Sequence, residues 1–362
     1  FSRLKVYTAY EYLENRFDSK TRTLTSFLFL LQRGLSTGIS VFAPSIILSS
    51  LFGWNIYYTN ILMGGLLIIY TMSGGAKAVA YTQQLQLIII FTGMFLAAYM
   101  VVNMLPDNVS FTDALEVSGK MGKLNVITTG FENGKFNWSD QYNLFSGLIG
   151  GFFLALSYFG TDQSQVGRYL TAKSLKQSRM GLLMNGFVKI PMQFGILLIG
   201  VLVFSFYQFN KAPIFFNDVQ LKKLESSVYK DSLVIATTQY EAITTLKQKA
   251  VVDYSAASDI NDKTAKAASM NTLEGLQKKS DSLRKSVKGW LASKEVGGDN
   301  NDTNYIFLRF VVDNLPVGLV GLLIAIIFLA SWGSIAAAIN SLASCTMIDF
   351  HRRFTKKKDT EE

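Results

Sequence analysis

Two long apolar runs joined by a short basic segment are the feature that most constrains the fold of this chain. Residues 144–160 carry no charged side chain, and residues 180–207 carry only Lys189. The segment between them contains the cations Arg168, Lys173, Lys176 and Arg179. A helix needs about 20 apolar residues to cross a bilayer, so both runs predict membrane-spanning helices. Cations of short loops gather on the cytoplasmic side of a membrane, which predicts that the basic segment faces the cytosol.

The composition favours an integral membrane protein over a soluble domain. Charged residues make up only 17% of the chain and hydrophobic residues 49%, whereas soluble domains average about 25% charged residues. The net charge of +9 follows the loops, so it indicates membrane orientation and not nucleic-acid binding. The single cysteine, Cys345, excludes an internal disulfide, and the single histidine, His351, excludes a multi-histidine zinc site and argues against a catalytic triad. We therefore expect no enzymatic activity.

Further apolar segments extend the pattern to six spans. They lie at about residues 24–51, 57–73, 78–104, 144–160, 180–207 and 316–348. Between the second and third spans, Gly74, Gly75 and Lys77 predict a flexible inner turn. Six crossings place both ends of the chain in the cytosol, and the basic short loops agree with that orientation. Because the chain opens without an initiator Met, we interpret it as an internal segment of a longer protein.

The chain divides into three parts. Residues 1–207 are interpreted as the first part of a membrane core, with a cytosolic lead-in, five spans and an external loop at about 105–141. Residues 208–303 are a polar insertion, expected to be extracellular or periplasmic. Residues 304–362 hold the last span and a basic cytosolic tail. Apolar residues of the insertion follow heptad spacing and predict a pair of packed helices; they are Leu273, Leu276, Leu283, Val287 and Trp290, with Leu221, Leu224 and Val228 beginning a second stripe.

Two cations fall inside predicted spans. Lys189 lies about ten residues past Arg179, roughly 15 Å into the bilayer at about 1.5 Å per residue, and Arg33 lies within the first span. None of the spans contains Asp or Glu in its interior, so we expect the partners of both cations to be backbone carbonyls, water, an absent segment or a bound anion. For Lys189 we favour a role on a substrate pathway. For Arg33 we favour snorkelling or a structural hydrogen bond.

The last span is rich in small and hydroxyl-bearing residues. Ser334 and Ser341 are seven residues apart and fall on one helix face, with Ala330 and Ala337 on the same stripe. Hydroxyl and carbonyl oxygens brought together on such a face are suitable ligands for Na⁺. The alternative is ordinary packing of a small-residue helix, and composition alone favours that alternative.

Four segments, in the same order along the chain, resemble the sodium:solute symporter family. They are 8–17 (Thr-Ala-Tyr-Glu-Tyr-Leu-Glu-Asn-Arg-Phe), 73–86 (Ser-Gly-Gly-Ala-Lys-Ala-Val-Ala-Tyr-Thr-Gln-Gln-Leu-Gln), 157–173 (Ser-Tyr-Phe-Gly-Thr-Asp-Gln-Ser-Gln-Val-Gly-Arg-Tyr-Leu-Thr-Ala-Lys) and 315–349. Gly167 departs from the family pattern, which has a second glutamine at that position. The resemblance implies an all-α integral membrane protein with a five-plus-five inverted-repeat core, of which this chain covers roughly the third to the eighth helix.

The resemblance also implies a sodium site on the last span. Ala330 and Ser334 match the positions that give the ion a carbonyl and a hydroxyl oxygen, and Gly333 stands where the family often has another serine, so that only its backbone can contribute. Gln83 replaces the family's aspartate, which puts a second sodium site used by some relatives in doubt. Gln83 and Arg33 are retained as candidates for the coupling of ion and solute.

Two further residues match solute-binding positions of sugar-carrying family members. Tyr158 aligns with the aromatic gate beneath the sugar, and Lys189 aligns with a substrate-contacting lysine. Without the resemblance, Tyr158 would be read as an aromatic residue at the membrane interface. Ala155 stands where the sugar carriers place an amide, so the sequence does not support sugar recognition of that kind.

The leading functional hypothesis is Na⁺-coupled symport of a small organic solute in a lipid bilayer, with no nucleic-acid partner. The lack of acidic residues in the spans adds the hypothesis of an anionic solute that pairs with Lys189. The alternative is a symporter-like sensory membrane domain of a signalling protein. Because the first core helix normally supplies half of both binding sites, we expect no transport from this chain expressed alone.

Overall fold

The computed structural model describes the backbone of residues 6–106, 109–125, 128–132, 134–170, 174–260 and 262–355. Within these ranges, the side chains of residues 51, 74–82, 132, 169 and 259 are not described.

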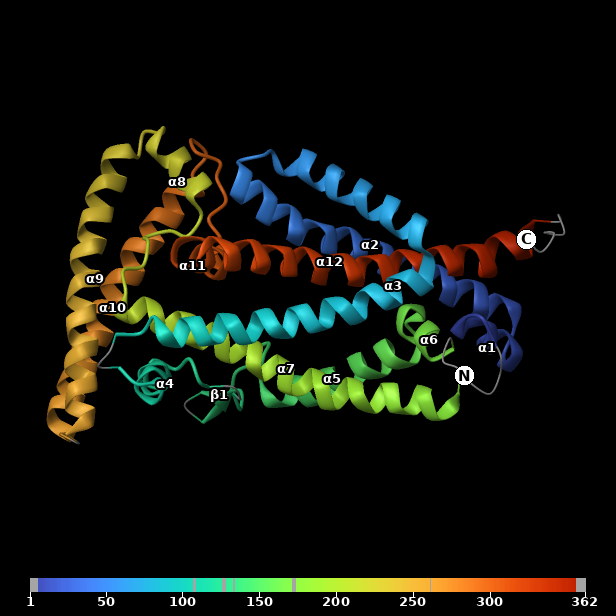
Figure 1. Ribbon diagram of the computed structural model, residues 1–362, viewed down its shortest axis with the longest axis horizontal. Helices are drawn as coiled ribbons and strands as arrows, with labels where there is room; N and C mark the ends of the chain where they lie inside the picture. Colours follow the sequence, from blue (N-terminus) through green and yellow to red (C-terminus); the bar gives the residue numbers. More distant parts are fainter. Residues whose placement is uncertain are drawn as a thin grey trace.

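Long helices form a bundle that makes up most of the molecule (Figure 1). They are α2 (Ser19–Phe52), α3 (Ile56–Asn103), α5 (Leu144–Gly160), α7 (Leu175–Phe209) and α12 (Val317–Cys345). Among the described residues, five helical segments are long and apolar enough to cross a membrane, and α5 is a shorter apolar helix. The fold is therefore an all-α membrane fold, as the sequence predicts, with five of the six expected spans at full length.

The second and third predicted spans both lie in α3, and the chain reverses between them as predicted, but through helical backbone and not through a flexible loop (Figure 1). The backbone stays helical through residues 74–77, and the two candidate spans are Ile56–Ser73 and Gln83–Asn103. Figure 1 shows that the chain nevertheless turns back between these two halves. Each interior glycine costs a helix only about 1 kcal/mol, which is too little to end a helix whose backbone hydrogen bonds must be satisfied within the chain.

The ends of the bundle helices are fixed by side-chain caps. Asp18 accepts a hydrogen bond from the backbone N–H of Thr21 at the start of α2, and Asn143 and Ser146 form a reciprocal capping box at the start of α5. Such caps satisfy N–H groups that have no partner within the helix.

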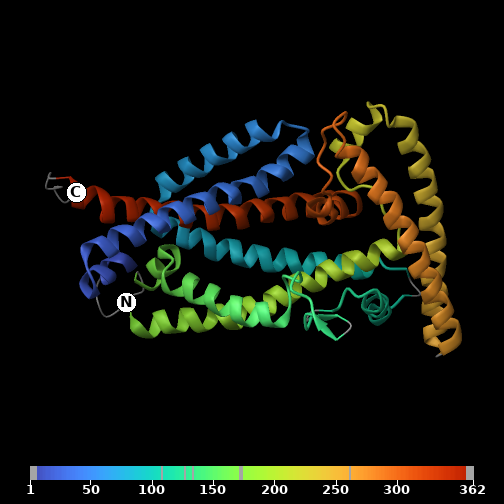
Figure 2. The same cartoon turned by 180° about the vertical axis from the view of Figure 1, so that it is seen from behind.

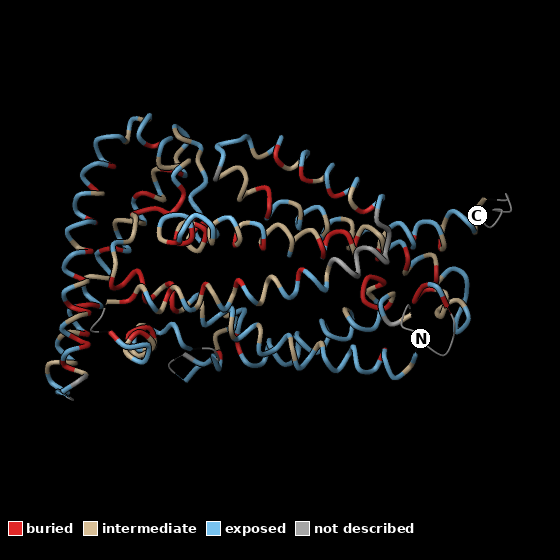
Figure 3. The backbone as a smooth tube through the Cα atoms, viewed as in Figure 1, coloured by how far each residue is buried: buried red, intermediate tan, exposed pale blue. Residues whose placement is uncertain are grey.

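The main packed core lies between α3, α7 and α12, together with α11 (Ile306–Asn314). Gly93 permits close approach of α12 to α3, because a Cβ there would lie 2.1 Å from Cδ1 of Ile326. In contrast, α5 has no buried residue along its length, and Figure 3 shows how much of the bundle surface is exposed. Many of the exposed residues of these helices are large and apolar, as expected of helices that face lipid.

Most of the remaining elements lie at the two ends of the bundle (Figures 1 and 2). At one end are α1 (Ala9–Arg16), α6 (Gln163–Leu170), the π-helical segment η2 (Thr346–His351) and α13 (Arg352–Phe354). At the other end are α4 (Phe111–Lys120), the hairpin of β1 (Phe131–Glu132) and β2 (Lys135–Phe136), α8 (Asp218–Glu225), α9 (Lys230–Asp259), α10 (Lys263–Leu291) and η1 (Thr303–Tyr305). The predicted insertion thus lies opposite to α1, while its side of the membrane stays a prediction.

The insertion is built on an antiparallel pair, α9 and α10. Leu273 and Val287 of the predicted seam are fully buried, and Leu224 is buried in α8. Val228 is 80% exposed, contrary to the predicted stripe, because α8 ends at Glu225 and the chain has left the helix before reaching it.

Candidate functional site

Tyr158 and Lys189, the two predicted solute-binding residues, lie together in the structure. Tyr158 is in the last turn of α5 and Lys189 is near the middle of α7. The Lys189 Nζ lies 5.6 Å from the centroid of the Tyr158 ring, which is a cation–π contact. The Tyr158 hydroxyl accepts a hydrogen bond of 2.7 Å from Nε2 of Gln165 in α6. The ring is thereby oriented by one helix and faces the cation of another.

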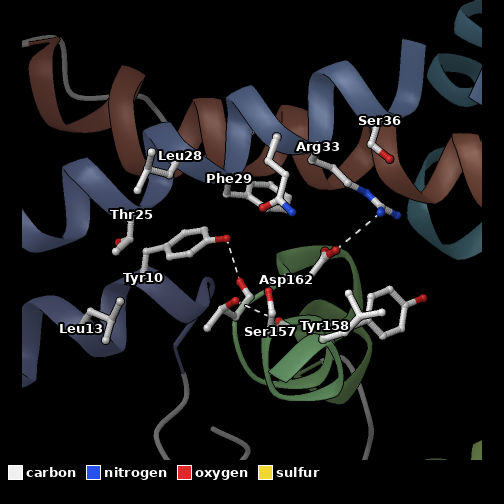
Figure 4. A pocket seen from close by; sticks show the side chains of 13 residues that line it. Tyr10, Leu13, Thr25, Leu28, Phe29, Arg33, Ser36, Ser157, Tyr158 and Asp162 are labelled. Carbon is white, nitrogen blue, oxygen red and sulfur yellow. Dashed lines mark hydrogen bonds and ion pairs between the residues drawn. The ribbon is translucent and has the colours of Figure 1, made fainter. Parts of the chain in front are cut away.

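A cavity of about 280 Å³ adjoins Tyr158. It lies between α1, α2 and α5, and Figure 4 shows its lining. Polar groups contributed by several elements face it, among them Tyr10, Arg33, Ser36 and Asp162. The cavity is large enough for a small organic solute and offers both hydrogen-bonding groups and aromatic rings.

Arg33 has an acidic partner, contrary to the expectation from the sequence. Its Nη1 lies 3.5 Å from Oδ2 of Asp162, the residue that joins α5 to α6. The other carboxylate oxygen of Asp162 accepts hydrogen bonds from the backbone N–H and the hydroxyl of Ser164. The sequence does not predict this pair, because Asp162 lies outside the spans, at the junction that follows α5, and only the fold brings α2 beside it. In the described part of the chain, Lys189 has no carboxylate within ion-pair distance, and the Tyr158 ring is its partner.

The three predicted sodium ligands on α12 fall on two faces. Ala330 and Ser334 are both exposed, whereas Gly333 is buried against α3. The hydroxyl of Ser334 donates to the backbone carbonyls of Ser331 (3.0 Å) and Ala330 (3.3 Å). Ala330 and Ser334 thus present a carbonyl and a hydroxyl oxygen side by side, as a Na⁺ site requires.

Gly333 and Gln83, two further candidates, contact each other. The amide Nε2 of Gln83 donates a hydrogen bond of 2.6 Å to the carbonyl oxygen of Gly333. A Cβ at Gly333 would lie 2.3 Å from Oε1 of the buried Gln86. The carbonyl of Gly333 is therefore engaged with α3 and is not directed to the face that holds Ala330 and Ser334.

A buried ionic network at the α1 end was missed by the sequence argument. Asp349, which is fully buried, accepts hydrogen bonds from the Arg22 guanidinium (2.7 Å) and the Thr8 hydroxyl (3.0 Å). Arg22 also pairs with Glu14 at 2.6 Å, and this hydrogen bond lowers the pKa of the Glu14 carboxyl below its usual range. Arg353 extends the network from the other side of Glu14. The one signal available was an Asp at the end of an apolar span.

Comparison with known proteins gives the family. The sequence profile of the sodium:solute symporter family matches residues 1–226, more than half of the chain. The chain belongs to the sodium:solute symporter family. This confirms the resemblance inferred from the four segments, and the protein is a multi-pass membrane protein.

Its relatives in this symporter family include the human sodium/iodide cotransporter, with 28% identity over 221 residues, which cover 57% of this chain and 31% of that protein. The human sodium-coupled monocarboxylate transporter 1 is 31% identical over 185 residues, covering 51% of this chain and 29% of the relative. These relatives are transporters and not enzymes, as expected. The chain spans about a third of the length of the curated relatives it matches.

A solved structure shares the fold of this symporter-family chain. It is the substrate-bound, outward-open state of a Na⁺-coupled sialic acid symporter, with a TM-score of 0.67 and 21% sequence identity. The match covers 99% of this chain and 56% of that one. The bundle, the insertion and the short end helices therefore fit within one known transporter architecture.

Proposed function

We propose that this chain is part of a Na⁺-coupled symporter that moves a small organic solute across a membrane by alternating access. The observation that carries the proposal is the contact of Lys189 with Tyr158 beside the polar cavity. A lysine inside an apolar helix is costly and usually marks a solute or ion pathway. Family membership supports the same function.

Sodium would be bound on the exposed face of α12. The carbonyl of Ala330 and the hydroxyl of Ser334 supply two oxygens there, and the remaining ligands come from other segments or from water. Binding that favours one conformational state over another is what couples the ion gradient to solute movement.

The solute is proposed to be anionic. Lys189 has no carboxylate partner among the described residues, so an anionic group of the solute can pair with its ammonium group. The Tyr158 ring would then lie beside the bound solute. The relatives described above are named for iodide and for monocarboxylates, which are anions. These are the first solutes to test.

The test is uptake by the full-length gene product in proteoliposomes. Radiolabelled iodide, a monocarboxylate and a vitamin are supplied with an inward Na⁺ gradient or with a choline gradient. We expect uptake of one of them only with Na⁺, and a several-fold weaker apparent affinity for Na⁺ in Ser334→Ala. The matched control is Ser344→Ala, which removes another exposed α12 serine that bonds its own helix backbone. Uptake that is independent of the Na⁺ gradient would refute the proposal.

A further inference from the structure

The helix that carries Tyr158 is held chiefly at its ends. None of the 17 residues of α5 is buried, so within the described residues the helix is fixed mainly by the contacts at its two ends. Its first turn is capped by Asn143. Its last turn leads into residues 161–163, which we call the α5–α6 junction, and these residues contact α1 and α2.

The α5–α6 junction makes four polar contacts with the neighbouring elements (Figure 4 shows two of them). Gln163 makes two: its Oε1 accepts from the backbone N–H of Ala9 at 2.8 Å, and its Nε2 donates to the carbonyl of Tyr7 at 3.0 Å. The other contacts are a hydrogen bond of 2.9 Å from the Tyr10 hydroxyl to the carbonyl of Thr161 and the ion pair of Asp162 with Arg33. Burial raises the pKa of Tyr10, which keeps its phenol in the donating form.

Gln163 is the centre of these contacts. Its side chain is enclosed, with 4% of the residue exposed, and it satisfies a donor and an acceptor of the α1 backbone at once. One amide thus closes α6 onto the start of α1, and partial opening would leave the Ala9 N–H, the Tyr7 carbonyl and the amide itself without these partners.

The elements on the α1 side of the junction are fastened to each other independently. Asp349 of η2 binds Thr8 at the start of α1 and Arg22 of α2, and Arg22 binds Glu14 of α1. The junction is therefore the place where α5 and α6 can separate from α1 and α2 without breaking this buried network.

We propose that the α5–α6 junction is a latch, with Gln163 as a positioning residue that holds Tyr158 beside Lys189 and closes the cavity at the α1 end. Opening of the latch frees the last turn of α5 and connects the cavity with the solution at that end. The inference rests on the proposed transport function for its role, but the latch itself is a structural statement that can be tested separately.

The first experiment measures opening with the native thiol. Cys345 is fully buried in a cluster with Val166 of α6 and with Ala9 and Tyr10 of α1, so movement of α6 exposes it.

In the purified chain in detergent, we expect N-ethylmaleimide to alkylate Cys345 about tenfold faster in Gln163→Ala than in the unmodified protein, since two hydrogen bonds are lost. Gln163→Glu keeps the acceptor for Ala9 and should give an intermediate rate. The control is Gln193→Ala, which removes an exposed amide of α7. Equal alkylation rates in all four proteins would overturn the latch.

The second experiment closes the latch covalently in the full-length gene product. Ala9→Cys and Gln163→Cys are introduced together with Cys345→Ser, and the two thiols are joined by a short bifunctional methanethiosulfonate. Radiolabelled Na⁺ flux into proteoliposomes is measured before crosslinking, after it and after reduction. We expect flux to be lost on crosslinking and restored on reduction, with no change in single-cysteine proteins treated in the same way.

The two experiments separate the inference from the proposed function. Flux that continues at its full rate with the crosslink intact overturns the latch. Faster alkylation in Gln163→Ala, combined with no Na⁺ flux in any protein before crosslinking, supports the latch and refutes the transport function. A block that reduction reverses shows that residues 9 and 163 must separate during flux, which a contact with a merely structural role does not require.

Discussion

Lys189, the only charged residue of the apolar segment 180–207, contacts the aromatic ring of Tyr158. Cation–π contacts contribute about 0.5–2 kcal/mol, depending on how far they are desolvated. Lys189 is exposed on α7 and Tyr158 is partly exposed, so the pair remains open to a third group, which the proposed anionic solute supplies.

Replacing Lys189 should weaken solute binding without removing the helix that carries it. For Lys189→Ala in the full-length protein, we expect the apparent KM for an anionic solute to rise about tenfold, because one charge-assisted contact is lost. Lys189→Arg keeps the charge and should lose much less. The measurement is the concentration dependence of Na⁺-driven uptake. An unchanged KM in Lys189→Ala would refute pairing of this lysine with the solute.

The buried carboxylate of Asp349 should be a large contributor to stability. Asp349→Asn leaves the Arg22 charge without one of its two acidic partners, and breaking a buried pair in this way costs about 3 kcal/mol. Denaturant unfolding of the chain in detergent, followed by tryptophan fluorescence, measures the loss. Asp313→Asn, which breaks a largely exposed pair with Arg309, should cost less than about 1 kcal/mol. Similar losses of unfolding free energy in the two variants would show that the buried Asp349 carboxylate is not a large contributor to stability.

At this scale, the sequence predicts residue types better than their partners. Tyr158 was found through the family motif and Lys189 as the only charge of its predicted span, and the structure brings them together. The partners of Arg33 and Arg22 were not found, because Asp162 and Asp349 lie far along the chain from them and become neighbours only in the folded bundle. Gly333 was grouped with Ala330 and Ser334 by motif position, although its place on the helix circumference directs it to Gln83.

Among the elements, long apolar runs were predictable and their connections were not. The hydropathy of the spans and the heptad spacing in α10 follow directly from the residues. The helical path of α3 through its glycines does not follow from the residues. The glycines favour a loop, but the backbone hydrogen bonds of a membrane helix must be satisfied within the chain, and the backbone stays helical there. The partner face of α9 was missed because it contains Thr244 and Lys247, two polar residues that break an apolar pattern.

The buried lysine of α9 makes the insertion sensitive to pH. Burial lowers the pKa of Lys247 from 10.5 to about 8, and its Nζ donates to Oε1 of Gln277. A lowered pKa means that the unfolded state binds the proton more tightly, so stability rises with pH above about 8. Near pH 10 the raised pKa of buried Tyr254 begins to act in the opposite direction. The gain between about pH 8 and pH 10 should be roughly 2 kcal/mol.

Hydrogen exchange of the α9 and α10 amides, corrected for intrinsic rates, measures this dependence. We expect stronger protection as the pH rises through this window in the unmodified chain. Lys247→Met should remove the increase, while Lys249→Met, which changes an exposed lysine two residues away, should keep it. Protection that is independent of pH in all three proteins would show that Lys247 is not desolvated in the hairpin.

The molecule has a buried polar network at one end of the apolar bundle and a helical hairpin packed on the other end. At one end, the network of Asp349 joins α1, α2 and η2; at the other, α9 and α10 pack on the ends of α3 and α7. The fold class was predictable because composition and hydropathy set it. The arrangement of the helices was not, because membrane helices associate through close packing and specific polar contacts, which hydropathy does not encode.

The length of α5 makes the protein responsive to membrane thickness. With 17 residues, it is about 26 Å long at roughly 1.5 Å per residue, while the hydrocarbon layer of a typical bilayer measures about 30 Å. This hydrophobic mismatch is relieved by local thinning of lipid or by tension on the helix ends. In vesicles of longer acyl chains, the tension should act on the Gln163 contacts, and Cys345 should react faster with maleimide than in short-chain vesicles. We therefore expect a membrane protein of this design to sense the lipid around it through the shortest of its long apolar helices, α5.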